Sequence, residues 1–176
     1  MKRTSLVAAA IAAVFAAPAF AGAPKMLHVT EKVEINAPVE KVWDAVKNYD
    51  GLNTWHPGFS GDEIVKGENN KVGAVRKLTV KDGPSFTEEL LAWNAKTHSY
   101  KYKIIESPLP IDKYSSTVTV KAAGKDKSVI VWNGDYKRKN ASANPPEAES
   151  DAGVLKLIHG VYRGGLDNVK ATLEKK

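Results

Sequence analysis

Apolar and polar residues alternate over residues 27–35 with a period of two. A two-residue period is typical of a strand with one buried face, so this segment is predicted to be a strand. Glu31 is the one position that breaks the alternation. The apolar positions are Leu27, Val29, Val33 and Ile35.

From Pro38 onward the apolar period changes to three and four residues, which fits one face of a short helix. Residues 48–51 end this helix, and residues 51–58 are too short and too broken by Gly and Pro to form a long one. The helical apolar positions are Val39, Val42, Trp43 and Val46.

Six further strands are predicted between turn-forming residues such as those at 68–70 and 82–84. The connections between successive strands are short, which is typical of an antiparallel meander. The predicted strands cover residues 59–67, 73–81, 85–94, 98–106, 112–122 and 127–138.

A polar, Pro-containing loop at residues 140–150, a candidate position for function, precedes the longest predicted helix. The whole order predicts an α+β fold: a seven-stranded curved antiparallel sheet that wraps around the long C-terminal helix, with short helices after the first strand. One helix cannot fill the concave side of such a sheet, so we expect a ligand cavity between them. The apolar face of the helix is formed by Leu155, Ile158, Tyr162, Leu166, Val169 and Leu173.

Residues 1–21 have the organisation of a secretory signal peptide. Lys2 and Arg3 precede an apolar run over residues 6–17, and Ala19 and Ala21 provide the small residues of a cleavage site. The run is shorter than the ~20 residues that a membrane-spanning helix needs, so no membrane span is expected in the mature chain. We therefore expect a periplasmic or secreted protein whose single domain covers residues 22–176.

Charge and cysteine content narrow the possible functions. Lys2 and Arg3 contribute two units to the formal net charge of +6, which leaves the mature chain a net +4, a bias that suits an acidic protein partner. The one dense basic run, residues 137–139, is interpreted as a solvated strand end, and no nucleic-acid partner is expected. Cysteine is absent and the four histidines lack metal-ligand spacing, so neither a metal nor another cofactor is expected.

Several short motifs occur in the order found in the START/Bet v1-like (SRPBCC) superfamily, and the chain resembles its polyketide cyclase/dehydrase-like branch from Val29 to Leu173. The resemblance implies a helix-grip fold with a cavity for a small hydrophobic molecule. The motifs are Ile35-Asn36-Ala37-Pro38, Val42-Trp43, Asp50-Gly51-Leu52, Trp55-His56-Pro57, Val72-Gly73-Ala74-Val75-Arg76, Glu88-Glu89-Leu90-Leu91, Tyr100-Lys101-Tyr102, Glu106-Ser107-Pro108-Leu109-Pro110 and Tyr162-Arg163-Gly164-Gly165-Leu166.

A narrower resemblance links the exported N-terminus, the Asn-Pro-Pro-Glu sequence at residues 144–147 and the Gly-Val-Tyr sequence at residues 160–162 to the MxaD family. Members of that family are periplasmic accessory proteins of bacterial methanol oxidation. The resemblance implies a non-enzymatic role that assists electron transfer from methanol dehydrogenase to cytochrome c. Those two proteins are then the expected acidic partners.

Strand alternation gives the expected cavity wall, because side chains two residues apart share a face. Arg76 and Glu88 are its polar groups, and since an isolated buried charge is very unfavourable, they either pair with each other or meet a polar ligand. Ala92 is placed on the same inward face as Glu88. The candidate ligand-binding residues are Trp55, His56, Arg76, Glu88, Tyr100, Tyr102, Tyr114, Trp132 and Tyr162.

His56 is the best candidate for an acid or a base, because the ordinary pKa of histidine is close to neutral. The alternative is that His56 holds its loop through hydrogen bonds to the backbone. Gly160, Gly164 and Gly165 each weaken the last helix by ~1 kcal/mol relative to Ala. They are explained either by close packing of the helix on the sheet, or by room for a ligand or a bend that opens the cavity.

Three functions remain open. The favoured one is a periplasmic, non-enzymatic protein that binds a small hydrophobic or aromatic molecule or acts as an accessory factor, with no catalytic residue. The second is a cyclase/dehydrase-like enzyme that uses His56, Arg76 and Glu88 for proton transfer on a carbonyl substrate. The third is a carrier of a lipid or another hydrophobic metabolite.

Overall fold

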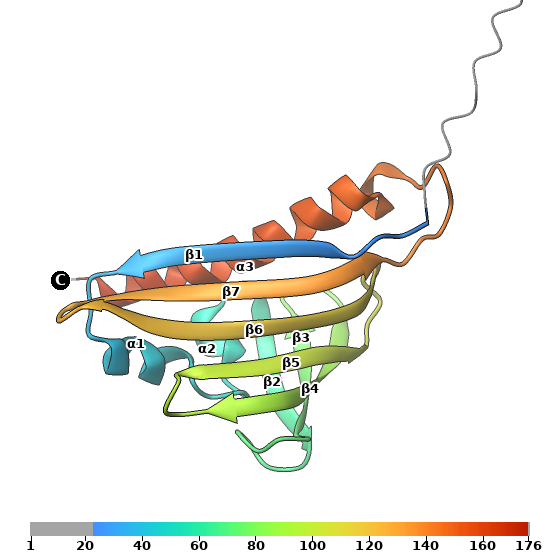
Figure 1. Ribbon diagram of the computed structural model, residues 1–176. Coiled ribbons are helices and arrows are strands. Elements are labelled where there is room, and N and C mark those ends of the chain that lie inside the picture. The colour runs from blue at the N-terminus through green and yellow to red at the C-terminus, as the bar shows by residue number, and fades with distance from the viewer. Residues whose placement is uncertain (1–22, 176) are drawn as a thin grey trace, which may run out of the picture.

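The computed structural model describes residues 23–175, and the predicted signal peptide lies outside the described residues. These residues form a sheet, three α-helices and one short 3-10 helix, η1 (Figure 1). The elements are β1 (Leu27–Ile35), α1 (Val39–Val46), α2 (Leu52–Trp55), β2 (Phe59–Lys66), β3 (Val75–Val80), β4 (Ser85–Asn94), β5 (Ser99–Glu106), β6 (Ile111–Gly124), β7 (Lys127–Arg138), η1 (Glu147–Glu149) and α3 (Asp151–Leu173).

The seven strands lie in the order β1-β7-β6-β5-β4-β3-β2, and every neighbouring pair is antiparallel. The six strands of the meander follow one another, and β1 joins at the far edge beside β7. Figure 1 shows α3 along one face of this sheet, with α1 and α2 near the end at which α3 terminates. The predicted α+β helix-grip architecture is confirmed.

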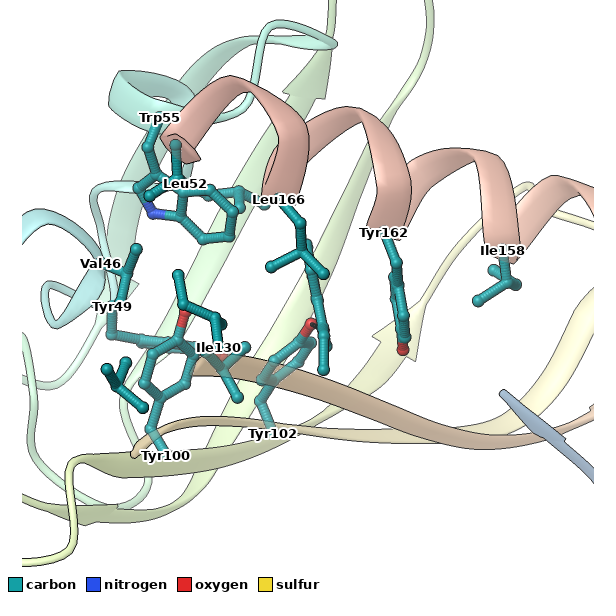
Figure 2. Close-up of a cluster of buried hydrophobic side chains, with 14 of the residues drawn as sticks. Val46, Tyr49, Leu52, Trp55, Tyr100, Tyr102, Ile130, Ile158, Tyr162 and Leu166 are labelled. Carbon is teal, nitrogen blue, oxygen red and sulfur yellow. Dashed lines mark hydrogen bonds between the residues drawn. The ribbon is translucent and has the colours of Figure 1, made fainter. Parts of the chain in front are cut away.

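The buried face of α3 holds the core together. Ser150 begins the helix, and its hydroxyl oxygen accepts a hydrogen bond from the Gly153 N–H at 3.1 Å. Figure 2 shows Ile158, Tyr162 and Leu166 pointing from α3 toward the sheet, as their spacing of four residues requires. Fully burying an apolar side chain of this size stabilises a fold by about 1.5–3 kcal/mol. Within residues 23–175, none of the helices combines the length and the apolar character that a membrane crossing requires.

Gly165 allows α3 to approach the sheet closely. A Cβ at this position would lie 2.6 Å from His56 Cδ2 and 3.1 Å from Trp132 Cζ3, so only a glycine fits without displacing its neighbours. A Cβ at Gly160, by contrast, would meet no atom within 4 Å, and one at Gly164 would meet only His56, at 3.9 Å. The close-packing interpretation is therefore correct for Gly165 alone.

A β-bulge in β4 overturns the predicted orientation of Ala92. Leu90 pairs with Tyr102, but Ala92 pairs with Lys101, because the register shifts by one residue between them. The alternation is interrupted at this shift, so Ala92 is exposed and Trp93 packs against the core instead. The prediction that Ala92 faces the cavity was wrong.

Arg138 corrects the interpretation of residues 137–139 as a solvated strand end. Its side chain is 4% exposed, and Nη1 donates hydrogen bonds to the backbone oxygens of Asn140 and Ser142, the latter at 3.0 Å. Its Nε lies 3.0 Å from Asp151 Oδ1. Arg138 therefore connects the end of β7 with the 140–150 loop and the start of α3.

Candidate functional site

A cavity of about 210 Å³ lies between α3 and the concave face of the sheet. Its wall is almost entirely apolar, apart from a few side chains that carry polar atoms. An apolar protein cavity of ~150 Å³ binds benzene, so this one has room for one or two rings. The wall consists of Leu52, His56, Gly58, Phe59, Leu78, Val80, Phe86, Glu88, Tyr102, Ile104, Leu109, Ile111, Tyr114, Trp132, Leu157, Ile158 and Val161.

The cavity meets the surface beside α3. His56, Leu157 and Val161 line both the cavity and an open groove on the surface of the molecule. The same groove is lined by Pro110, before β6, and by Glu147, in the 140–150 loop. The end of that loop therefore lies at the entrance, where it can affect access.

Arg76 lies behind the cavity wall, with all three guanidinium nitrogens bonded. Nε and Nη2 donate to Glu88 Oε2 at 2.9 and 2.6 Å, because the two residues face each other across β3 and β4. Nη1 donates to Asp62 Oδ2 at 3.2 Å and to the backbone oxygen of Tyr49. The guanidinium carbon also lies 4.3 Å from the centre of the Tyr49 ring and 5.1 Å from that of Tyr102.

This cluster contains two carboxyl groups and one guanidinium, each with a side chain at most 4% exposed. Burial raises the pKa of Glu88 and of Asp62, although Arg76 acts in the opposite direction. Burial alone would lower the pKa of Arg76, but Glu88 and Asp62 outweigh it and raise the pKa, so the guanidinium stays charged. Arg76 compensates one negative charge, and the two carboxyl groups compete for it.

A chain of hydroxyl groups connects the cavity wall to α3, and its direction is fixed because each hydroxyl has one hydrogen. Ser116 donates to the backbone oxygen of Asn133 at 2.6 Å. The 2.8 Å bond between Tyr162 and Ser116 is therefore donated by Tyr162, and the 2.7 Å bond between Tyr114 and Tyr162 by Tyr114. The hydrogen of Tyr114 points to Tyr162, so a ligand meets only the lone pairs of Tyr114.

Trp132 links this chain to Tyr102. Its Nε1 donates to Ser116 Oγ at 2.9 Å and to the Tyr102 hydroxyl oxygen at 3.0 Å, and its ring stacks on Tyr162 with centres 4.2 Å apart. The Tyr102 hydroxyl donates no hydrogen bond of ordinary geometry to another of residues 23–175, although the Ser116 hydroxyl lies near it. Tyr102 is therefore a hydrogen-bond donor available to a ligand.

His56 is held by the backbone at both ring nitrogens. Nε2 lies 2.7 Å from the Val161 backbone oxygen, to which it can only donate, and Nδ1 accepts from the Gly58 N–H at 3.0 Å. Burial lowers the pKa of His56, although the bond to Val161 opposes this effect, so the ring is neutral with its hydrogen on Nε2. His56 cannot exchange a proton with a ligand without breaking a backbone bond, which favours the loop-holding interpretation.

The structure brings five of the nine candidate residues to the cavity wall: His56, Glu88, Tyr102, Tyr114 and Trp132. That these side chains contact a ligand stays a prediction.

The other four candidates lie behind the wall. Arg76 is behind Glu88, and Tyr100 is in the core beside Tyr49. Trp55 lines a separate small pocket beside the end of α3, and the hydroxyl of Tyr162 is occupied by its neighbours.

Sequence reasoning missed Asp62 and Tyr49, the other partners of Arg76. Asp62 had a detectable signal, because it lies two residues before Ile64 in β2 and so shares its inward face. Tyr49 had none, since it contacts Arg76 through its backbone oxygen and its ring from a loop without periodicity.

The fold and the cavity together define a helix-grip protein of the START/Bet v1-like (SRPBCC) superfamily, which confirms that resemblance. A family model described as polyketide cyclase / dehydrase and lipid transport matches residues 26–174. The chain belongs to this family.

Solved structures with the same fold come from several bacteria. An uncharacterised protein of Bacillus thuringiensis is 28% identical, with a TM-score of 0.74, over 85% of this chain and all of the other. The protein XoxI of Bacillus cereus is 28% identical, with a TM-score of 0.71, over 83% of this chain and 94% of the other. Zhui aromatase/cyclase of a Streptomyces species is 18% identical, with a TM-score of 0.72, over 85% of this chain and 94% of the other, and this likeness concerns the fold alone.

Proposed function

We propose that this protein binds a small hydrophobic ring compound in the cavity between α3 and the sheet, and releases it unchanged. The observation that carries the proposal is the apolar cavity of about 210 Å³ with few polar groups, which is typical of a binding site for an apolar ligand. The bonded nitrogens of His56 support a non-enzymatic role, because they remove the best candidate for a general base.

The same proposal places the protein in the periplasm, as an accessory factor of the MxaD type. It is supported by the signal-like residues 1–21, by the net +4 of the remaining chain and by the segments at residues 144–147 and 160–162 that resemble that family. In this role the protein would dock on an acidic partner, such as methanol dehydrogenase or cytochrome c, and assist electron transfer between them.

A second candidate is an enzyme of the aromatase/cyclase kind, which is the description of one protein with the same fold. Glu88 favours it, because a buried carboxyl group at a cavity wall is suited to proton transfer. Arg76 and His56 do not, because their nitrogens are all bonded to protein atoms. Glu88 would have to act without the other two.

The cavity proposal can be tested with naphthalene and two neighbouring variants. Ile104→Trp places a large ring inside the cavity, whereas Ile105→Trp is its matched control, because Ile105 is 49% exposed on the other face of β5. Naphthalene binding, measured by ligand-observed NMR, is expected to be lost in Ile104→Trp and kept in Ile105→Trp. Equal binding by the two variants would contradict the proposal.

A further experiment separates binder from enzyme. Protein purified from its own periplasm, analysed by native mass spectrometry, is expected to retain a small hydrophobic molecule. That molecule, after incubation with fresh protein, is expected to be recovered unchanged. Conversion to a new compound that stops in Glu88→Gln would favour the enzyme instead.

A further inference from the structure

Glu88 offers one carboxyl oxygen to the cavity. Its Oε2 accepts both hydrogen bonds from Arg76, and its Oε1 has no hydrogen-bond partner among residues 23–175. The side chain is only 4% exposed and forms part of the cavity wall. An unpartnered carboxyl oxygen in an apolar wall is unfavourable. A ligand in the cavity that donates a hydrogen bond to Glu88 Oε1 would therefore be favoured.

Tyr102 offers the opposite kind of group. Its hydroxyl oxygen accepts from Trp132 Nε1, and within the described part of the chain the hydroxyl donates no hydrogen bond of ordinary geometry, with Ser116 as its hydroxyl neighbour. Tyr102 also lines the cavity. The wall thus contains one free acceptor and one free donor, at Glu88 and Tyr102.

The two groups are neighbours on one face of the sheet. Leu90 pairs with Tyr102, and Glu88 is two residues from Leu90, which makes Glu88 and Tyr102 a diagonal pair on β4 and β5. Arg76 connects them on the side away from the cavity, because it bonds to Glu88 and lies over the Tyr102 ring. A single ligand group can therefore lie between the two.

We propose that the cavity selects ring compounds that carry a hydroxyl group, such as phenols and naphthols. The ligand hydroxyl donates its hydrogen to Glu88 Oε1, and its oxygen accepts the hydrogen of Tyr102. A hydroxyl satisfies both protein groups, whereas a carbonyl or an ether oxygen accepts only and leaves Glu88 unpaired. This inference rests on the proposed function and names its ligand class.

Three ligands of similar size test the inference: naphthalene, 2-methoxynaphthalene and 2-naphthol. The affinity of 2-naphthol, measured by isothermal titration calorimetry, is expected to exceed those of the other two by at least about tenfold, since only its hydroxyl hydrogen-bonds to both Glu88 and Tyr102. If 2-methoxynaphthalene binds as tightly as 2-naphthol, Glu88 does not accept a hydrogen bond and the inference is wrong. If none of the three binds, the proposed function itself fails.

The variant Tyr102→Phe removes the donor and leaves the ring in place. It is expected to lower the ratio of the 2-naphthol affinity to the naphthalene affinity about tenfold. Tyr100→Phe is the matched control, because Tyr100 lies on the same face of β5 and is absent from the cavity wall. An undiminished preference for 2-naphthol over naphthalene in Tyr102→Phe would overturn the inference.

The variant Glu88→Gln tests the acceptor. Circular dichroism and naphthalene binding establish first that the variant is folded. A folded variant is expected to bind 2-naphthol at least about tenfold more weakly, because the charged acceptor is lost. Unchanged 2-naphthol affinity in the folded variant would contradict the assignment of Glu88.

Discussion

Arg76 illustrates how a buried charge depends on every group around it. Its guanidinium donates four hydrogen bonds to two carboxyl groups and one backbone oxygen, and the rings of Tyr49 and Tyr102 lie close to it. Without the guanidinium, the two carboxyl groups would remain buried with no cation beside them. That environment disfavours their negative charge. The cluster behind the cavity is thus a single unit.

Replacing Arg76 with Met is expected to lower the free energy of unfolding by about 3–5 kcal/mol, because Glu88 and Asp62 would remain buried without a cation. Urea denaturation at pH 7 measures the change. The matched control is Lys77→Met, since Lys77 is the next residue in β3 and its amine lies on the surface, 3.7 Å from Glu63. That control is expected to lose less than about 1 kcal/mol. Equal losses in both variants would contradict this account.

His56 predicts a pH dependence of stability. Its pKa is lowered in the folded protein, whereas in the unfolded chain it is about 6.5. As the pH falls below that value, the unfolded chain binds a proton that the folded protein does not, so the contribution of His56 to stability is lost.

The free energies of unfolding of the wild type and of His56→Gln are expected to converge between pH 7.5 and 5.5, by at most about 1.4 kcal/mol per pH unit. Comparing the two proteins at each pH cancels the effects of Glu88 and Asp62. Their raised pKa values act in the opposite direction, because they favour the folded state at low pH and lose that contribution as the pH rises. A difference that stays constant with pH would show that His56 is freely protonated in the folded protein.

Among the elements, α3 sets the size of the cavity through its distance from the sheet. At Gly165 the helix touches His56 and Trp132 directly, and farther along, at Leu157 and Val161, it forms the wall at the entrance. The helix therefore packs directly on the sheet near Gly165. Toward its N-terminal half, at Leu157 and Val161, it lies farther from the sheet and leaves room for the cavity.

Gly165→Ala is expected to destabilise the protein by about 1–3 kcal/mol, because the new methyl group overlaps His56 and Trp55, at 2.6 and 2.9 Å. Gly160→Ala lies on the exposed side of the same helix, where a Cβ meets nothing within 4 Å. It is expected to stabilise the protein by up to ~1 kcal/mol through helix propensity alone. Thermal unfolding followed by circular dichroism compares the two, and an equal effect of both changes would refute the close-packing explanation.

The elements themselves were largely predictable from periodicity. Residues 127–138 and 85–94 form strands with the predicted bounds, because turn-forming residues delimit them. The orientation of Ala92 was not predictable, since a bulge adds one residue to a strand without changing its composition.

The cavity wall was predictable only where side chains follow the strand period, as at Glu88 and Tyr102. Of the wall residues of α3, only Ile158 belongs to the predicted apolar stripe, because Leu157 and Val161 lie beside that stripe and face the cavity at its edge. Arg76 lies behind the wall because it bonds to Asp62 and to the backbone oxygen of Tyr49. Those partners come from other segments of the chain, so the pattern of one strand cannot reveal them.

At the scale of the whole molecule, the proposed docking on an acidic partner would depend on charge, because residues 22–176 carry a net +4. The affinity for an acidic periplasmic partner is expected to fall at least about tenfold between 0.1 and 1 M salt, because the screening length shortens from about 10 to 3 Å. Biolayer interferometry at several salt concentrations measures it, with naphthalene binding as the salt-insensitive control. An affinity that does not change with salt would argue against such docking.

The chain of hydroxyl groups also has an evolutionary consequence. Tyr114 and Ser116 belong to β6 and Tyr162 to α3, and each of the three depends on the next for a hydrogen bond. Losing one hydroxyl leaves a buried partner unsatisfied, whereas replacing the set with apolar residues is nearly neutral. In the lineages of this family, the three positions are therefore expected to be inherited or exchanged together, as a covarying group that joins the sheet to the helix.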